Sequence, residues 1–164
     1  MKASNLAAMA VFGGLCAAKS LINGRTADRR RDKLWYRLLR KPPQTPPDWV
    51  FSVMWPTLQA LEAYSGYRAW QHRHQRGAKT AVALWGTQFA FNGAWTSLFF
   101  RRHRARAALV DLYLNLATSI AYTRRMVELD RKAAAAMLPY VAWLGFASTV
   151  NRGIVRRNSR LLAR

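Results

Sequence analysis

Five apolar stretches, separated by clusters of cations, constrain this chain more than any other feature. They cover residues 5–22, 49–70, 80–100, 107–122 and 133–155, so each is 16 to 23 residues long. An α-helix needs about 20 apolar residues to cross a ~30 Å hydrocarbon core. A soluble amphipathic helix would carry charges at every third or fourth position, whereas these stretches carry at most two each. The pattern predicts an all-α membrane protein, a bundle of five transmembrane helices forming one domain over residues 1–164.

The cations are distributed unequally between the two predicted sides. The long basic loop 23–48, the loop after the third stretch and the C-terminal tail hold 17 Lys and Arg, against 9 on the opposite side. The positive-inside rule then predicts an N-terminus outside and a cytoplasmic C-terminus. A cleaved signal peptide is the alternative for residues 5–22. We expect retention, because removal would leave four helices and an unpaired aromatic surface.

The net charge of +20 raises a second hypothesis, a basic nucleic-acid-binding protein. A content of 51% hydrophobic residues, with seven Trp, argues against a small soluble domain. As loop anchors, the same cations would meet anionic lipid headgroups instead. We therefore expect the lipid bilayer, and no nucleic acid, as a partner.

The sequence offers no constellation for catalysis. It has no Ser/His/Asp set, no paired carboxylates at useful spacing and no Gly-rich phosphate loop. The single Cys16 excludes an intramolecular disulfide, and the histidines lie in loops beside arginines. We assign no catalytic residue and no metal ligand.

Ionisable and amide side chains inside the apolar stretches need a physical reason, because burying them is unfavourable. Asp111 has two interpretations: a local ion pair with an arginine of residues 101–106, or a proton relay. Asn92 and Asn151 either form hydrogen bonds between helices or contact a ligand. Together, Trp55, Asn92, Trp95 and Trp143 could line a pocket with flat apolar walls, which suits a planar aromatic ligand.

Small residues recur at four-residue spacing in the third apolar stretch. Gly86, Ala90 and Ala94 would share one helix face. Such a face lets helix backbones approach closely. The alternatives are packing within the bundle and a homodimer through this helix.

Four prolines between residues 42 and 47 precede the second apolar stretch. Proline fixes φ and disfavours helix in the residue before it, which predicts a stiff, extended segment. Asp48 follows the last proline and is expected to cap the next helix.

Three segments resemble one known family. They are "WYRLLRKPPQTPPDWVFSVMWPTL", "QFAFNGAWTSLFF" and "LPYVAWLGFASTVNRGIVRRN". They match the patterns WYxxLxKPxxxPPxWVFxxxW, NxxWxxxFF and PYxxWxxFAxxxN of the TspO/MBR family, also called the tryptophan-rich sensory protein, translocator protein or peripheral benzodiazepine receptor family. The resemblance spans residues 35–158.

The resemblance implies a five-helix bundle, often dimeric, with a pocket covered by the first loop. It implies porphyrins such as protoporphyrin IX or haem as ligands, and no required cofactor; animal members also bind cholesterol and benzodiazepine-type drugs. By motif, the ligand-binding residues would be Tyr36, Trp55, Asn92, Trp95, Trp143 and Ala147. The residues shaping the loop lid would be Pro42, Pro46 and Pro47.

Several positions depart from the family pattern. Gln59 stands where Tyr is frequent, and Arg152 replaces the Tyr of an animal sterol-recognition motif. Ala107 replaces a Trp of animal members, so the resemblance does not imply sterol or drug binding.

The expected function is binding of porphyrin-like ligands in transport, sequestration or sensing. The alternative is an enzyme that degrades porphyrin in light. The expected location is a bacterial cell membrane, with the mitochondrial outer membrane as the alternative.

Overall fold

The computed structural model describes residues 3–27, 30–160 and 162, and all regular secondary structure within them is helical. The five long helices are α1 (Ala3–Ala27), α3 (Asp48–Gln71), α4 (Ala78–Thr96), α5 (Ala105–Leu129) and α6 (Arg131–Arg157). A short helix, α2 (Arg30–Leu38), precedes α3, and a π-helical turn, η1 (Ser97–Arg101), extends α4. The prediction of an all-helical chain is confirmed. The predicted long basic loop 23–48 is partly helical, because α1 continues to Ala27 and α2 lies within it.

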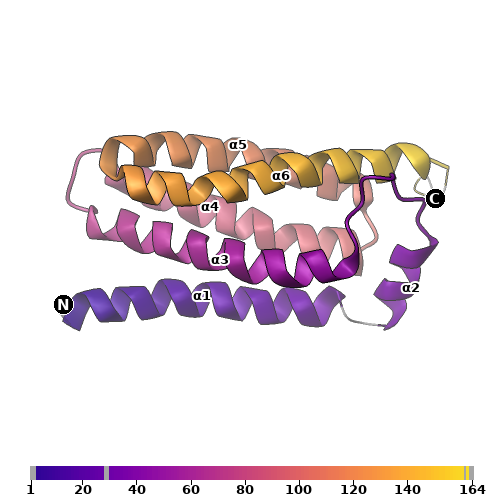
Figure 1. Ribbon diagram of the computed structural model, residues 1–164, viewed down its shortest axis with the longest axis horizontal. Helices are drawn as coiled ribbons and strands as arrows, with labels where there is room; N and C mark the ends of the chain where they lie inside the picture. The colour runs from indigo at the N-terminus through magenta and orange to yellow at the C-terminus, as the bar shows by residue number, and fades with distance from the viewer. Residues whose placement is uncertain (1–2, 28–29, 161, 163–164) are drawn as a thin grey trace.

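The long helices run side by side, and α2 stands across one end of them (Figure 1). Helix α3 packs against α1 and α6, and α5 packs against α4 and α6. Gly66 permits the close approach of α3 to its neighbours: a Cβ there would lie 2.5 Å from the Trp85 ring and 2.7 Å from Phe12. The absence of a side chain at Gly66 thus lets α3 lie directly against side chains of α1 and α4.

Helix α2 is held at the end of the bundle by a polar contact of Asp32 and by two ring contacts of Trp35. Asp32 is buried, and its Oδ1 lies 3.2 Å from His103 Nε2 in the α4–α5 connection. The Trp35 ring stacks on the His103 ring at 4.5 Å between centroids and meets Phe99 edge-on at 5.1 Å. These contacts explain why a segment rich in cations still folds onto the bundle.

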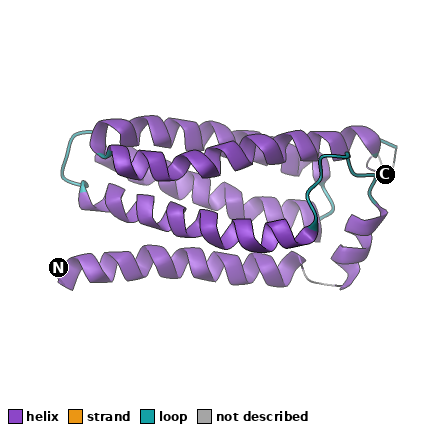
Figure 2. Cartoon of the chain, viewed as in Figure 1, coloured by secondary structure: helices purple, strands orange, loops and turns teal. Residues whose placement is uncertain are grey.

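The proline segment is fastened to the end of α6, as the loop drawn between α2 and α3 shows (Figure 2). The backbone N–H of Arg40 donates to Asn158 Oδ1 at 2.9 Å, and Asn158 Nδ2 donates to the Arg40 carbonyl at 3.0 Å. Pro42 packs so closely on Gly153 that a Cβ at Gly153 would lie 2.8 Å from the Pro42 ring. The predicted cap at Asp48 is wrong: Pro47 occupies the N-cap position, and Asp48 is the first residue of α3.

Two of the described helices, over Leu6–Arg25 and Arg131–Arg157, are apolar and long enough to cross a membrane by length and composition. The count of five spans therefore stays a prediction. Helices α3, α4 and α5 do not meet this criterion, and many of their polar residues lie inside the bundle. These buried polar residues are Gln59, Glu62, Ser65, Gln88, Asn92, Thr96, Asp111, Asn115, Ser119 and Thr123.

Candidate functional site

A cavity of about 560 Å³ lies at the α2 end of the bundle and touches every helix. This volume falls in the range of small-molecule sites. The six ligand-binding residues predicted from the family motifs all line it: Tyr36, Trp55, Asn92, Trp95, Trp143 and Ala147. Their role in binding stays a prediction, but the fold brings residues from four separate helices to one space.

Aromatic rings form most of the cavity wall. The Trp55 and Trp143 rings meet edge-on, with 6.4 Å between centroids and 81° between planes. Phe51 lies one helical turn before Trp55 and meets Trp143 at 5.7 Å. The Trp95 ring stacks on Phe99 at 5.0 Å and 11°. Flat faces and edges are thus presented from α3, α4, η1 and α6, an arrangement suited to a planar hydrophobic molecule.

The π-helical turn η1 determines where two of these rings lie. A π turn shifts the side chains that follow it relative to a regular α-helix. Phe99 and Phe100 lie in this turn, and both line the cavity beside Tyr36, at 6.2 Å and 5.7 Å between ring centroids. The FF pair of the family motif thus closes the cavity toward α2.

Two asparagines at the deep end of the cavity are connected to the bundle through Tyr140. Asn92 Nδ2 and Asn115 Nδ2 both donate to the Tyr140 hydroxyl, at 2.9 Å and 3.2 Å. The Ser119 hydroxyl in turn donates to Asn115 Oδ1 at 3.3 Å. This chain joins α4, α5 and α6 and fixes the amide orientation of Asn92, so the interhelical interpretation of Asn92 holds together with its place in the lining.

Tyr36 lines the cavity from α2. Lys41 Nζ lies 4.2 Å above its ring, a cation–π contact. Burial, with the nearby Asp48 carboxylate adding to it, raises the pKa of the Tyr36 phenol. None of the three predicted lid prolines lines the cavity; they shape the loop that follows Tyr36.

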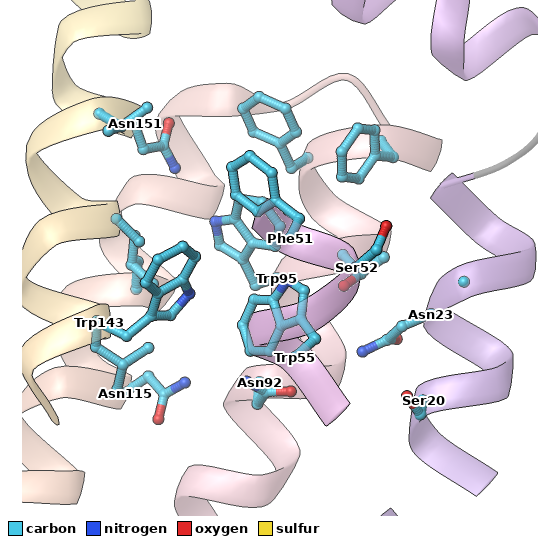
Figure 3. A pocket seen from close by; sticks show the side chains of 18 of the residues that line it. Ser20, Asn23, Phe51, Ser52, Trp55, Asn92, Trp95, Asn115, Trp143 and Asn151 are labelled. Carbon is cyan, nitrogen blue, oxygen red and sulfur yellow. The ribbon is translucent and has the colours of Figure 1, made fainter. Parts of the chain in front are cut away.

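Several lining residues were not predicted from the sequence. Phe51 and Gln59 lie one turn to either side of Trp55, and Phe146 lies beside Ala147, so helical spacing from the motif tryptophans could have identified them. Ser20 and Asn23 come from α1 and face the cavity from the side opposite Trp143 (Figure 3). No spacing rule could have identified these two, because the position of α1 depends on its contacts with α3.

A buried ion pair joins α1 to α3. Lys19 Nζ lies 2.7 Å from Glu62 Oε2, and both side chains are almost fully buried. Lys19 Nζ also lies 4.2 Å from the Phe89 ring centroid.

The predicted ion pair of Asp111 is wrong within the described residues: Asp111 Oδ2 is buried without a hydrogen-bond partner. The arginines of the neighbouring loop, residues 101, 102, 104 and 106, are exposed.

The small-residue face of α4 lies outside the bundle. Gly86, Ala90 and Ala94 are all exposed, and a Cβ at Gly86 would meet no atom within 4 Å. Packing within the bundle is therefore not their role in this chain. The homodimer interpretation stays a prediction.

The sequence matches the TspO/MBR family over residues 7–157. The translocator protein of Bos taurus is 35% identical over 136 residues, which cover 79% of this chain and 80% of the relative. Protein CrtK of Rhodobacter capsulatus is 32% identical over 125 residues, covering 76% and 78% of the two chains. The tryptophan-rich protein TspO of Archaeoglobus fulgidus is 32% identical over 125 residues, covering 76% and 80%.

Proposed function

The chain belongs to the TspO/MBR family of integral membrane proteins, and from this premise we propose that its cavity binds a planar, hydrophobic tetrapyrrole. Protoporphyrin IX and haem are the ligands proposed first. The protein would take up such a molecule from the bilayer and carry, sequester or sense it.

The observation that carries this proposal is the shape and lining of the cavity. Trp55, Trp95 and Trp143 converge from three helices on a space of about 560 Å³. Aromatic walls with a few polar groups favour a flat ring system over a flexible chain.

The distribution of side chains supports a membrane location with five spans. Large apolar side chains are exposed on α1, α3, α5 and α6, as expected where lipid replaces water. Between residues 49 and 67 of α3 the only charged residue is the buried Glu62, and residues 80–100 carry none. The cation-rich α2 end of the bundle would face the cytoplasm, with the N-terminus outside.

Titration of the purified protein with protoporphyrin IX tests the proposal. Binding is expected to quench tryptophan fluorescence and shift the porphyrin absorption band, with saturation at one ligand per chain. A signal no larger than that of detergent micelles alone would overturn it.

A second candidate is light-dependent degradation of the bound porphyrin. The contact between the Trp55 and Trp143 rings favours it, because neighbouring indoles beside a photosensitiser can donate electrons. Illumination separates the two functions. An enzyme would yield a tetrapyrrole product that is absent from illuminated free porphyrin, and a binding protein would not.

A further inference from the structure

We propose that Asn151 of α6 anchors a carboxylate of the ligand and so orients the ligand in the cavity. The inference rests on the proposed function, because it concerns the same cavity. Beyond the proposed function, it states that one end of the ligand carries an acidic group and that this end lies toward the α2 end of the bundle.

The first observation is an unpaired amide. Asn151 is 2% exposed and lines the cavity, yet neither Nδ2 nor Oδ1 has a hydrogen-bond partner among the described residues. Figure 3 shows its side chain directed from α6 into the cavity. Burying an amide without hydrogen-bond partners is unfavourable, and the free energy lost is larger than a typical hydrogen bond contributes to stability. Such a group is expected where a ligand supplies the missing partner.

The second observation is that unpaired donors gather around the same space. The indole N–H groups of Trp95 and Trp143, both lining residues, are also buried and have no partner in the described part of the chain. An indole N–H can only donate. By contrast, Trp85 lies outside the cavity, and its indole donates to the Glu62 carbonyl at 2.9 Å. The lining thus holds three unpaired donors and two unpaired acceptors, Asn151 Oδ1 and Gln59 Oε1. The donors outnumber the acceptors, which favours a ligand that carries oxygens.

The third observation is the position of Asn151 along α6. It lies about two turns beyond Trp143, toward the end where α6 carries Arg152, Arg156 and Arg157. The charged residues of the lining itself, Lys33 and Asp48, also belong to this end. Excess positive charge around the end of the cavity favours an anionic group there. A neutral carbonyl would satisfy the amide but would gain nothing from the arginines.

The experiment compares protoporphyrin IX with its dimethyl ester, which keeps the ring and removes both negative charges. The wild type is expected to bind the diacid about tenfold more tightly than the ester, since a hydrogen bond to a charged group is stronger than one to a neutral group. Asn151→Leu should weaken binding of the diacid about tenfold and binding of the ester clearly less, because the ester carbonyl loses only a neutral hydrogen bond. Asn151→Asp keeps the shape of the side chain but replaces its Nδ2–H donor with an oxygen. This variant should also lose the preference for the diacid over the ester.

Thr149→Val on the exposed side of α6 is the matched control and should keep the wild-type preference. Elution volume and thermal unfolding in detergent show that each variant is folded. Equal loss of diacid and ester binding in Asn151→Leu would overturn the inference in favour of a packing role. Equal wild-type affinity for both ligands would also overturn it. Absence of binding of either ligand by the wild type would instead overturn the proposed function, and this inference with it.

Discussion

Lys19 and Glu62 place two opposite charges inside the bundle at 2.7 Å. Glu62 Oε1 has no further hydrogen-bond partner among the described residues. A buried pair of this kind adds little net stability, but removing one partner leaves an uncompensated charge. Its effect in this fold is to fix the register of α1 against α3, and so the position of Ser20 and Asn23 at the cavity.

Replacing one member of this pair should be more harmful than replacing both. Glu62→Leu leaves Lys19 unpaired and should lower the free energy of unfolding by roughly 3–5 kcal/mol. Lys19→Met together with Glu62→Leu should recover most of that loss. Thermal unfolding in detergent micelles measures both. A double variant as unstable as the single one would contradict this account of the pair.

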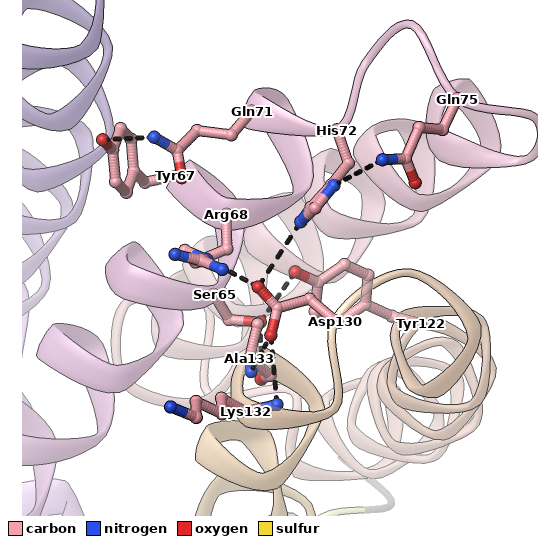
Figure 4. Close-up of polar contacts among 10 residues, drawn as sticks. All are labelled: Ser65, Tyr67, Arg68, Gln71, His72, Gln75, Tyr122, Asp130, Lys132 and Ala133. Atoms are coloured by element: carbon pink, nitrogen blue, oxygen red, sulfur yellow. Dashed lines mark hydrogen bonds and ion pairs between the residues drawn. The ribbon is translucent and has the colours of Figure 1, made fainter.

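Asp130 joins three elements at the end of the bundle opposite α2 (Figure 4). Its Oδ1 accepts the backbone N–H of Lys132 at 3.0 Å and of Ala133 at 3.1 Å, so it caps α6. Its Oδ2 pairs with Arg68 of α3. Burial alone would raise the pKa of Asp130, but the hydrogen bond from Ala133 and the contact with Arg68 outweigh burial, and the pKa is lowered.

A lowered pKa fixes the direction of the pH dependence. Stability contributed by Asp130 is present above the unfolded value of about 3.9 and is lost as the pH falls through the lower folded value. Asp130→Asn keeps a capping oxygen but removes the negative charge that faces Arg68 and the N-terminus of α6. The variant should therefore be less stable than the wild type at pH 7, by about 1 kcal/mol. The difference should shrink below about pH 4. Melting curves from pH 3 to 8 provide the measurement, and a difference that grows toward acid would contradict the assignment.

At the scale of elements, the proline loop and α6 behave as one unit. Asn158 holds the backbone of Arg40, and Pro42 fits against Gly153. The loop connects the end of α2, which carries Tyr36, to Asp48, the first residue of α3, and both residues line the cavity. Detaching the loop should therefore open one side of the site.

Gly153→Val tests this attachment, because its side chain would overlap the Pro42 ring. The porphyrin dissociation rate should rise about tenfold, equivalent to ~1.4 kcal/mol. Trypsin should also cleave faster after Arg40, whose backbone is held by Asn158 in the attached loop. Gly145→Val on the same helix is the matched control, since a Cβ there meets nothing within 4 Å. Equal dissociation rates in the two variants would show that the loop does not retain the ligand.

The sequence predicts the long helices well because each carries an apolar stretch between clusters of cations. It fails at α2, where the turn-forming prolines nearby and the density of arginines conceal an amphipathic helix whose Asp32 and Trp35 contact His103. For the site, motif residues on α3, α4 and α6 could be predicted. The contribution of α1 could not, since it depends on the pairing of Lys19 with a residue 43 positions away.

At the scale of the whole molecule, α4 presents a different outer surface from the other long helices. Large apolar residues are exposed on α1, α3, α5 and α6, whereas none of the exposed large hydrophobic residues belongs to α4. Gly86, Ala90 and Ala94 lie on its exposed face. Close approach of a second α4 is the use that such a face has in membranes.

A homodimer through α4 should be sensitive to side-chain size on this face. Gly86→Leu together with Ala90→Leu should convert a dimer into a monomer in detergent. Ala117→Leu on the exposed side of α5 should have no effect. Light scattering coupled to size-exclusion chromatography measures the mass. A wild type that is already monomeric in both detergent and lipid nanodiscs would contradict the proposal.

The central claim is that the tryptophan-walled cavity binds a tetrapyrrole. Its most direct test is the dissociation constant of protoporphyrin IX for two double variants, measured by porphyrin absorbance so that loss of tryptophans does not alter the signal. Trp55→Ala with Trp143→Ala removes two lining rings and should weaken binding at least tenfold. Trp49→Ala with Trp70→Ala removes two exposed indoles outside the cavity and should leave the affinity unchanged. Equal affinity of the two double variants would contradict the claim.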